Sequence, residues 1–147
     1  MTQEQQHTRL KSYEQAKKSY AEAMRYIANA KDYLQKAGMD NKGFYADKKY
    51  VRTACGTAYN GVLEALETYL RLKNPSAFET NERKTIDFYR RHLAKENKKM
   101  LKSLENAYYV LHIGGYYDGV KVPDFIKGGF KSAKEIIDLI KPAGGAQ

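Results

Sequence analysis

The feature that most constrains this sequence is a seven-residue repeat near its beginning. Large apolar or aromatic residues fill one position of the repeat: Tyr13, Tyr20, Ile27 and Leu34. Alanine fills the second position four times: Ala16, Ala23, Ala30 and Ala37. Two such positions per heptad form a seam along one side of a helix, and alanine lets a partner helix approach closely. We therefore expect a helix over residues 8–37, ended by Gly38 in a left-handed conformation.

A second helix is expected from Asp47, a suitable N-cap, to about Lys73. It carries small residues that suit close packing on the alanine seam: Ala54, Cys55, Ala58, Gly61 and Ala65. Larger apolar side chains occupy most of its remaining circumference, which predicts that this helix is central in the fold.

Asn74 and Pro75 interrupt the pattern, and a third helical region is expected from residue 76 to about Ile113. A short helical turn near 76–80 can be separate from the main helix. Gly114 and Gly115 are expected to end this region, and a glycine-flanked loop follows. The last helix carries Phe130, Ala133, Ile136, Ile137 and Ile140.

These segments predict an all-α fold, an up-down antiparallel four-helix bundle that has five helices if the short extra one is counted. We expect one domain over residues 1–147, with a disordered N-terminus over about 1–7 and a disordered tail over about 142–147. The seam has a second use, dimerisation, but with four helices in one chain the intramolecular use is favoured.

Composition limits the chemistry. Cys55 is the only cysteine, so we expect neither a disulfide nor a cysteine-based metal site, and its small neighbours indicate a core position. The start is polar, without the apolar stretch of a signal peptide, and no apolar run reaches the length of a membrane span. A cytoplasmic protein without membrane contact, metal or cofactor is therefore expected.

The third region carries most of the excess positive charge. Residues 83–102 contain eight basic residues, opposed only by Asp87 and Glu96, in a chain of net charge +9. On one continuous helix, five of the basic side chains would fall within roughly 60° of each other. These five residues, the basic stripe, are Lys84, Arg91, Lys95, Lys98 and Lys102.

Like charges along one helix face repel each other, so an ordinary solvated face usually mixes signs. A row of about 27 Å can instead follow several phosphates of a nucleic acid. The alternatives for the basic stripe are a lysine-rich solvated face, a site for RNA or another polyanion, and a surface for an acidic protein.

Thirteen tyrosines and no tryptophan are the second unusual feature. Tyrosine rings can stack on nucleobases, although most of these tyrosines fall at helix seam positions. Tyr116, Tyr117 and Asp118 differ, because they lie in the expected loop and form a possible ligand loop, weighed against a plain connection.

Nothing in the sequence predicts a catalytic group. His92 and His112 are twenty residues apart on the expected third helix, too far to share a metal, and neither follows a glutamate by three residues as in di-iron bundles. Each is a single histidine on a helix, which is typical of a surface or hydrogen-bonded residue.

The segments AMRYIANAKDYLQKAG (23–38) and YVRTACGTAYNGVLEALETYL (50–70) resemble the paired opening helices of HEPN-type bacterial bundles. The resemblance covers about two thirds of the chain. Active members of that group are metal-independent RNases in which an arginine is followed by four to six residues and then a histidine, and no arginine holds such a position before His92 or His112. The resemblance therefore implies a non-catalytic relative that binds nucleotides or partner proteins. The sequence also resembles one of the uncharacterised bacterial helical-bundle families, for which no activity is assigned.

Together these features predict a non-enzymatic helical bundle that binds RNA or another polyanion through the basic stripe. The alternative is a structural or protein–protein interaction module, either a homodimer or a bundle that binds a partner protein.

Overall fold

The computed structural model describes residues 1–143 and begins with a helix longer than expected. Helix α1 (Gln3–Ala37) starts at a capping box, in which Thr2 accepts a hydrogen bond from the Gln5 N–H and the Gln5 side chain accepts one from the Thr2 N–H. Residues 3–7, expected to be disordered, are therefore helical. Gly38 ends α1 at the predicted position with a positive φ of 66°, but its ψ of 179° differs from the left-handed helical conformation that was expected. Most of the tail expected beyond Pro142, residues 144–147, lies outside the described residues.

The alanine seam joins α1 to the antiparallel helix α2 (Lys48–Lys73). Ala23, Ala30 and Ala37 are buried, so the seam is used within the chain. Gly61 of α2 approaches α1 so closely that a Cβ added there would lie 3.0 Å from the Ala23 carbonyl oxygen. The predicted N-cap of α2 is confirmed, since the Asp47 carboxylate accepts a hydrogen bond of 3.0 Å from the Lys49 N–H.

The third region is not one helix, and the prediction of a continuous helix to Ile113 is wrong. The separate turn near 76–80 is present as η1 (Pro75–Phe78), and an extended segment then leads to α3 (Ile86–Glu96). At Asn97, with φ −160° and ψ 79°, the backbone leaves the helical conformation. It resumes in η2 (Lys98–Met100) and α4 (Leu101–Ala107).

Tertiary packing accounts for this break. Phe88, Tyr89 and Leu93 of α3 are buried, and α3 contacts the end of α2 rather than continuing the line of α4. The Asn97 side-chain amide donates a hydrogen bond of 3.4 Å to the Tyr69 hydroxyl of α2. Burying three large side chains outweighs the helical hydrogen bonds lost at one residue.

Helix α4 continues into η3 (Tyr108–Tyr117), a π-helix of ten residues that contains the glycine pair. Gly114 and Gly115 were expected to end the helix, and that prediction is wrong. Both lie buried inside it. A Cβ at Gly115 would lie 2.2 Å from the Cys55 Sγ of α2, and one at Gly114 would lie 2.5 Å from the Phe125 ring. The glycines allow close helix packing.

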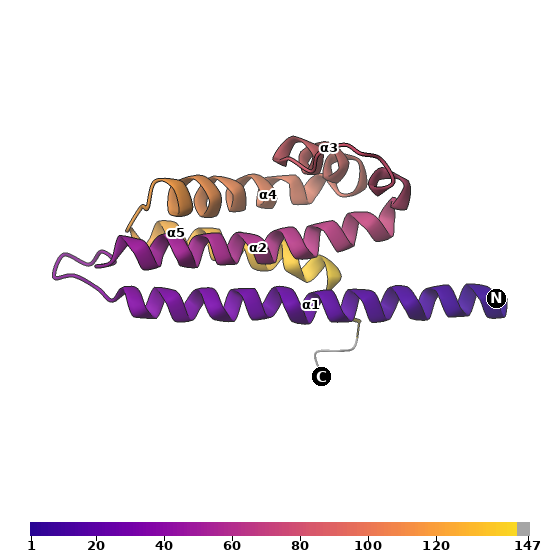
Figure 1. Ribbon diagram of the computed structural model, residues 1–147, viewed down its shortest axis with the longest axis horizontal. Helices are drawn as coiled ribbons and strands as arrows, with labels where there is room; N and C mark the ends of the chain where they lie inside the picture. Colours follow the sequence, from indigo (N-terminus) through magenta and orange to yellow (C-terminus); the bar gives the residue numbers. More distant parts are fainter. Residues whose placement is uncertain (144–147) are drawn as a thin grey trace.

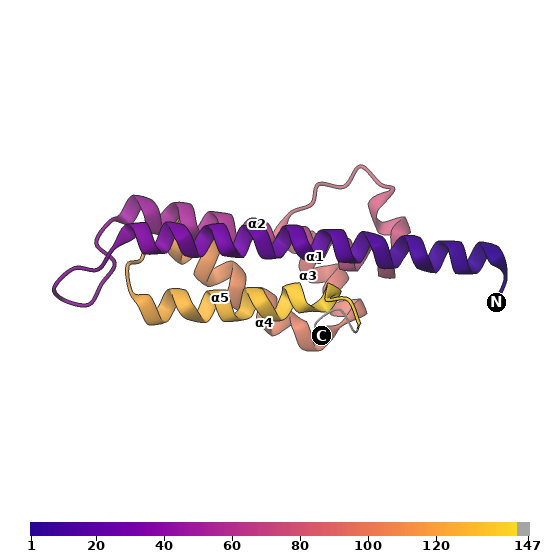
Figure 2. The same cartoon turned by 90° about the horizontal axis from the view of Figure 1, so that it is seen from below.

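Helix α5 (Pro123–Ile137) and the turn η4 (Asp138–Ile140) complete the bundle and bury Ala133, Ile136, Ile137 and Ile140, as predicted. Figures 1 and 2 show α1, α2, the combined α4–η3 helix and α5 running alternately in opposite directions, with α3 at one end. The predicted all-α bundle with one short extra helix is confirmed. Within residues 1–143 no helix combines the length and apolarity needed to cross a membrane.

Candidate functional site

The break at Asn97 divides the basic stripe among several elements. Lys84 lies in the extended segment before α3, Arg91 and Lys95 lie on α3, Lys98 on η2 and Lys102 on α4. The five residues therefore do not share one helix face, and the expected straight row is wrong. The reason is the break at Asn97, which lets the apolar face of α3 pack on α2.

Two of the five basic side chains already interact with other residues of the protein. Arg91 forms an ion pair with Glu82, and the Lys84 ammonium lies 5.6 Å from the centre of the Phe78 ring. By contrast, Lys95 and Lys98 are exposed, and within residues 1–143 neither forms an ion pair. Lys102 is also exposed and has no ion pair in the described chain, so these three lysines are the part of the stripe best placed to meet an anion.

The possible ligand loop is also not a loop. Tyr116 and Tyr117 are the last two residues of η3, and Asp118 caps it by donating a backbone hydrogen bond to the Ile113 carbonyl. Tyr116 remains 47% exposed and Tyr117 60% exposed, so the helix presents both rings to solvent. The structure thus keeps these tyrosines accessible but places them on a rigid element.

Tyr116 belongs to a row of rings that we call the aromatic ladder: Tyr108, His112 and Tyr116, four residues apart on η3. The Tyr108 and His112 ring centres are 5.3 Å apart, and those of His112 and Tyr116 are 5.9 Å apart with only 10° between the planes. From α2, the ring of Tyr59 lies 4.9 Å from His112. The Arg90 guanidinium lies 5.2 Å from the centre of the Tyr108 ring, a cation–π contact at the far end of the row.

Between α2 and the ladder lies a cleft of about 490 Å³, which we call the aromatic cleft. Its lining residues are Arg52, Thr53, Gly56, Thr57, Tyr59, Asn60, Leu63, His112 and Tyr116. None of them is acidic. Arg52 donates a hydrogen bond of 3.0 Å to the Tyr117 carbonyl, which places a second arginine beside the ladder at the end opposite Arg90.

Two glycines of different helices shape the aromatic cleft. A Cβ at Gly56 of α2 would lie 2.9 Å from the Tyr116 ring, so this glycine lets the ring lie against α2. Gly115 brings η3 down onto Cys55, which is fully buried, and burial raises the pKa of the Cys55 thiol to about 12. Cys55 is therefore a packing residue, as its neighbours predicted, and the wide π-helix holds the ladder at a fixed distance from α2.

Burial favours the uncharged form of two aromatic groups in the cleft, His112 and Tyr59. It lowers the pKa of His112 and raises the pKa of the Tyr59 hydroxyl, in each case because the charged form loses hydration. At neutral pH the imidazole and the phenol are both neutral. Tyr116 is the exposed ring at one end of the ladder, and with the positive charge of Arg52 beside it the cleft suits a planar ring attached to an anion.

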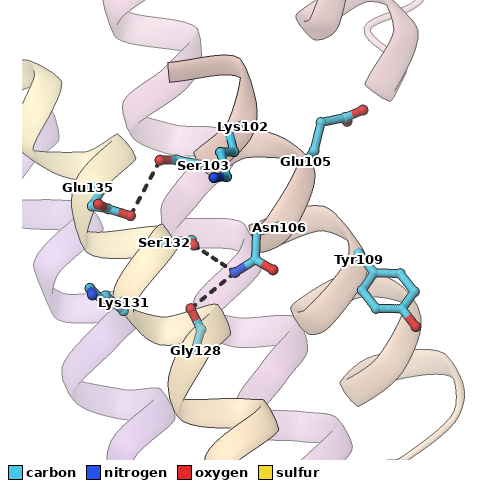
Figure 3. Close-up of a pocket in the computed structure, with 9 residues that line it drawn as sticks. All are labelled: Lys102, Ser103, Glu105, Asn106, Tyr109, Gly128, Lys131, Ser132 and Glu135. Carbon is cyan, nitrogen blue, oxygen red and sulfur yellow. Dashed lines mark hydrogen bonds between the residues drawn. The ribbon is translucent and has the colours of Figure 1, made fainter. Parts of the chain in front are cut away.

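A second depression, the polar groove, lies on the other side of the same helix, between α4–η3 and α5 (Figure 3). It measures about 710 Å³ and includes Lys102 from the basic stripe and Lys131 from α5. Its lining residues are Lys102, Ser103, Glu105, Asn106, Tyr109, Gly128, Lys131, Ser132 and Glu135.

Most polar side chains of the polar groove already have partners in the protein. Asn106 donates hydrogen bonds to the Ser132 hydroxyl, at 2.8 Å, and to the Gly128 carbonyl, at 3.3 Å, while Ser103 bonds Glu135 (Figure 3). Glu105 pairs with Arg90 at 2.7 Å. These contacts join α4 to α5 and α3, so we regard the polar groove as a structural interface.

Sequence reasoning missed four residues of the aromatic cleft: Arg52, Tyr59, Asn60 and His112. The four-residue spacing of Tyr108, His112 and Tyr116 could have shown that His112 shares a helix face with two tyrosines. Arg52 and Asn60 carry no comparable pattern, because their role depends on where η3 lies. In residues 1–143 no three acidic, histidine or cysteine side chains are grouped as a metal site would require.

Fold and site together define an all-α bundle with an aromatic cleft between its central helix and a π-helix. The chain belongs to the family described as domain of unknown function DUF5618, whose family model matches residues 18–142. It is similar to a protein of unknown function from Dyadobacter fermentans, with 40% sequence identity and a TM-score of 0.73. That match covers 85% of this chain and 94% of the other.

No curated protein matches the chain. The prediction of an uncharacterised helical-bundle family is confirmed, whereas neither of the two matches above is to a HEPN protein, so that resemblance stays a prediction. The family match begins at Lys18, and it includes every residue of the aromatic cleft and of the polar groove.

Proposed function

We propose that this protein is a non-enzymatic module that binds single-stranded RNA in the aromatic cleft. The observation that carries the proposal is the composition of that cleft: neutral aromatic rings, Arg52 at one end of the ladder and no acidic residue in the lining. Proteins that bind single strands combine these elements, because bases stack on aromatic rings while cations follow the backbone.

Arg52 is the expected phosphate contact. Its side chain is exposed, and only one hydrogen bond, from Nη2 to the Tyr117 carbonyl, ties it down within the described chain. The remaining guanidinium N–H groups are free to bind phosphate oxygens, a geometry that arginine favours. A base stacked on the ladder and a phosphate on Arg52 would then belong to the same nucleotide.

Lys95 and Lys98, outside the aromatic cleft, are the next candidates for phosphate contacts. Both are exposed and unpaired within residues 1–143, and the chain's net charge of +9 attracts a polyanion from a distance. Lys95 and Lys98 thus support RNA binding, although the basic stripe is not a row along one helix.

A single strand suits the cleft better than a duplex does. In a duplex the faces of the bases are covered by their neighbours, and extruding one of them costs a few kcal/mol. Non-catalytic HEPN proteins, which the sequence resembles, bind nucleotides or partner proteins, in line with this role. We place the proposed activity in the cytoplasm, where single-stranded RNA is abundant.

Fluorescence anisotropy with a labelled, mixed-sequence RNA of about 12 nucleotides tests the proposal. Tyr116→Ala should weaken binding by about 1–3 kcal/mol, the usual value of one stacked base. Tyr109→Ala is the matched control, because Tyr109 is a 60% exposed tyrosine of the same helix that lines the polar groove instead. Absence of wild-type binding at low salt, or equal losses in the two variants, would overturn the proposal.

Self-association is the second candidate, favoured by apolar side chains exposed at the free end of α1. Leu10 is 60% exposed, and Tyr13 and Leu72 are 42% and 39% exposed beside a shallow hollow of about 320 Å³. A second copy of the chain would cover this surface. Sedimentation at several protein concentrations tests it: a monomer throughout would exclude the dimer, and a dimer abolished by Leu10→Lys with Tyr13→Lys would support it.

A further inference from the structure

We propose that the aromatic cleft selects adenine, and that the side-chain amide of Asn60 reads the base. This inference rests on the proposed function and names the base that the cleft takes. Asn60 lies on α2, is exposed and lines the cleft together with His112 and Tyr116. Its position brings a carboxamide to the edge of the space in which a stacked base would lie.

The amide of Asn60 is available for a ligand. Within residues 1–143 its side chain takes part in no hydrogen bond, in contrast to Asn106 of the polar groove, which makes two. Thr57, one turn earlier on α2, also lines the cleft without a hydrogen bond from its side chain in the described chain. Polar groups without partners beside an aromatic surface are what a specific ligand site provides.

The hydrogen-bonding pattern favours adenine. A carboxamide offers one donor and one acceptor side by side, which matches the adenine N6 amino group and the adjacent ring nitrogen. Guanine offers O6, N1–H and an N2 amino group in a row. One carboxamide can bind two of these groups, so the N2 amino group lacks an acceptor, and no carboxylate lines the cleft to supply one. Cytosine and uracil have smaller rings and therefore less area to stack on the ladder.

The experiment compares labelled homopolymers of about 12 nucleotides made of adenosine, cytidine or uridine, with a guanosine-rich mixed strand as the fourth probe. Wild-type protein should prefer the adenosine strand by roughly 5- to 150-fold, the range expected for one bidentate contact. Asn60→Ala should abolish the preference but still bind all strands. Asn60→Asp, which keeps the shape but loses the donor, should do the same and bind every strand more weakly.

Asn41→Ala is the matched control, because Asn41 is an exposed asparagine of the turn between α1 and α2 that does not line the cleft, and it should keep the preference. Competition with adenosine monophosphate and cytidine monophosphate shows whether a free nucleotide suffices. Equal binding of all strands by wild type, or a preference that survives Asn60→Ala, would overturn the adenine inference alone. Binding of adenosine monophosphate but of no RNA would keep the adenine site and overturn the RNA proposal, and binding of neither would overturn both.

Discussion

The aromatic cleft and the polar groove flank the same helix, yet they differ in how their polar side chains are used. In the polar groove, Asn106, Ser103 and Glu105 are hydrogen-bonded to α5 or α3. In the aromatic cleft, the side chains of Asn60 and Thr57 have no hydrogen bond within residues 1–143. The larger depression is therefore the less promising site, because a polar group that already has a partner contributes little to binding a ligand.

Two glycines, one near each depression, differ in the space around them. Below the aromatic cleft, Gly115 leaves no space, since a Cβ there would lie 2.2 Å from the Cys55 Sγ. At Gly128, which lines the polar groove, a Cβ would meet no atom within 4 Å. A tightly packed floor keeps the ladder in place, as a site with preorganised stacking surfaces requires.

The largest expected effect is on the free energy of unfolding, when one glycine near each depression is replaced by alanine. Gly115→Ala forces an atom into the buried Cys55 side chain and should destabilise the fold by about 1–3 kcal/mol. Gly128→Ala lies in a helix with open space around it and should stabilise by up to about 1 kcal/mol. Urea unfolding of both variants measures the difference. Equal stabilities would mean that η3 can move away from α2, and the tightly packed floor would be wrong.

Replacing one asparagine of each depression by alanine should separate effects on stability from effects on RNA binding. Asn106→Ala removes two hydrogen bonds and leaves the buried Ser132 hydroxyl unpaired, so it should cost about 1–2 kcal/mol of stability. Asn60→Ala should change stability by less than about 0.5 kcal/mol, because its side chain is exposed and without a partner.

RNA binding should show the opposite order in the same two variants. Anisotropy should find weaker binding of an adenosine strand for Asn60→Ala and unchanged binding for Asn106→Ala. If Asn106→Ala instead loses affinity while remaining folded, the polar groove takes part in binding and the contrast between the two depressions fails.

The features that the sequence predicts well are those governed by local rules. The alanine seam follows from a repeat, and the boundaries at Gly38 and Asp47 follow from the preferences of helix ends. The break at Asn97 follows no such rule, because no glycine or proline is near and the cause is the burial of α3 on α2. Local propensity was overridden there by tertiary contacts.

The site was predictable only in part for a related reason. Tyr116 and Tyr117 were recognisable because they follow glycines outside the apolar repeat, but those glycines serve a π-helix whose wider turn has no simple sequence pattern. Arg52 and Asn60 belong to a helix whose composition indicates a core role. Which of its faces stays open depends on the path of η3, and only the folded chain shows that path.

A smaller effect concerns the exposed lysines of α3 and η2. Each phosphate contact on a single strand contributes about 0.7 to the slope of log affinity against log salt. Replacing Lys95 and Lys98 by glutamine should therefore lower the slope by about 1.4 and weaken all strands about equally. The control is Lys17→Gln with Lys18→Gln, an exposed pair on α1. Equal slopes in the two double variants would show that net charge alone, and not this surface, attracts RNA.

The smallest expected effect is on the pH dependence of stability. It distinguishes the two depressions because, of the two, only the aromatic cleft contains a histidine. Burial among rings lowers the pKa of His112 from its ordinary value of 6.5, so the unfolded chain binds a proton more readily than the folded one. Stability from this group is complete above about pH 6.5 and declines as the pH falls through that value toward the lowered pKa of the folded state. His92, whose pKa burial also lowers, adds a similar loss on α3.

His112→Gln should remove its share of that decline, whereas His7→Gln, in the exposed first turns of α1, should leave the decline as it is. Urea unfolding between about pH 5 and 7.5 measures both variants against wild type. If His112→Gln keeps the full acid dependence, then the imidazole is hydrated in the folded protein. A hydrated imidazole would mean that the rings around it do not exclude water, and burial would then not be what keeps this part of the aromatic cleft neutral.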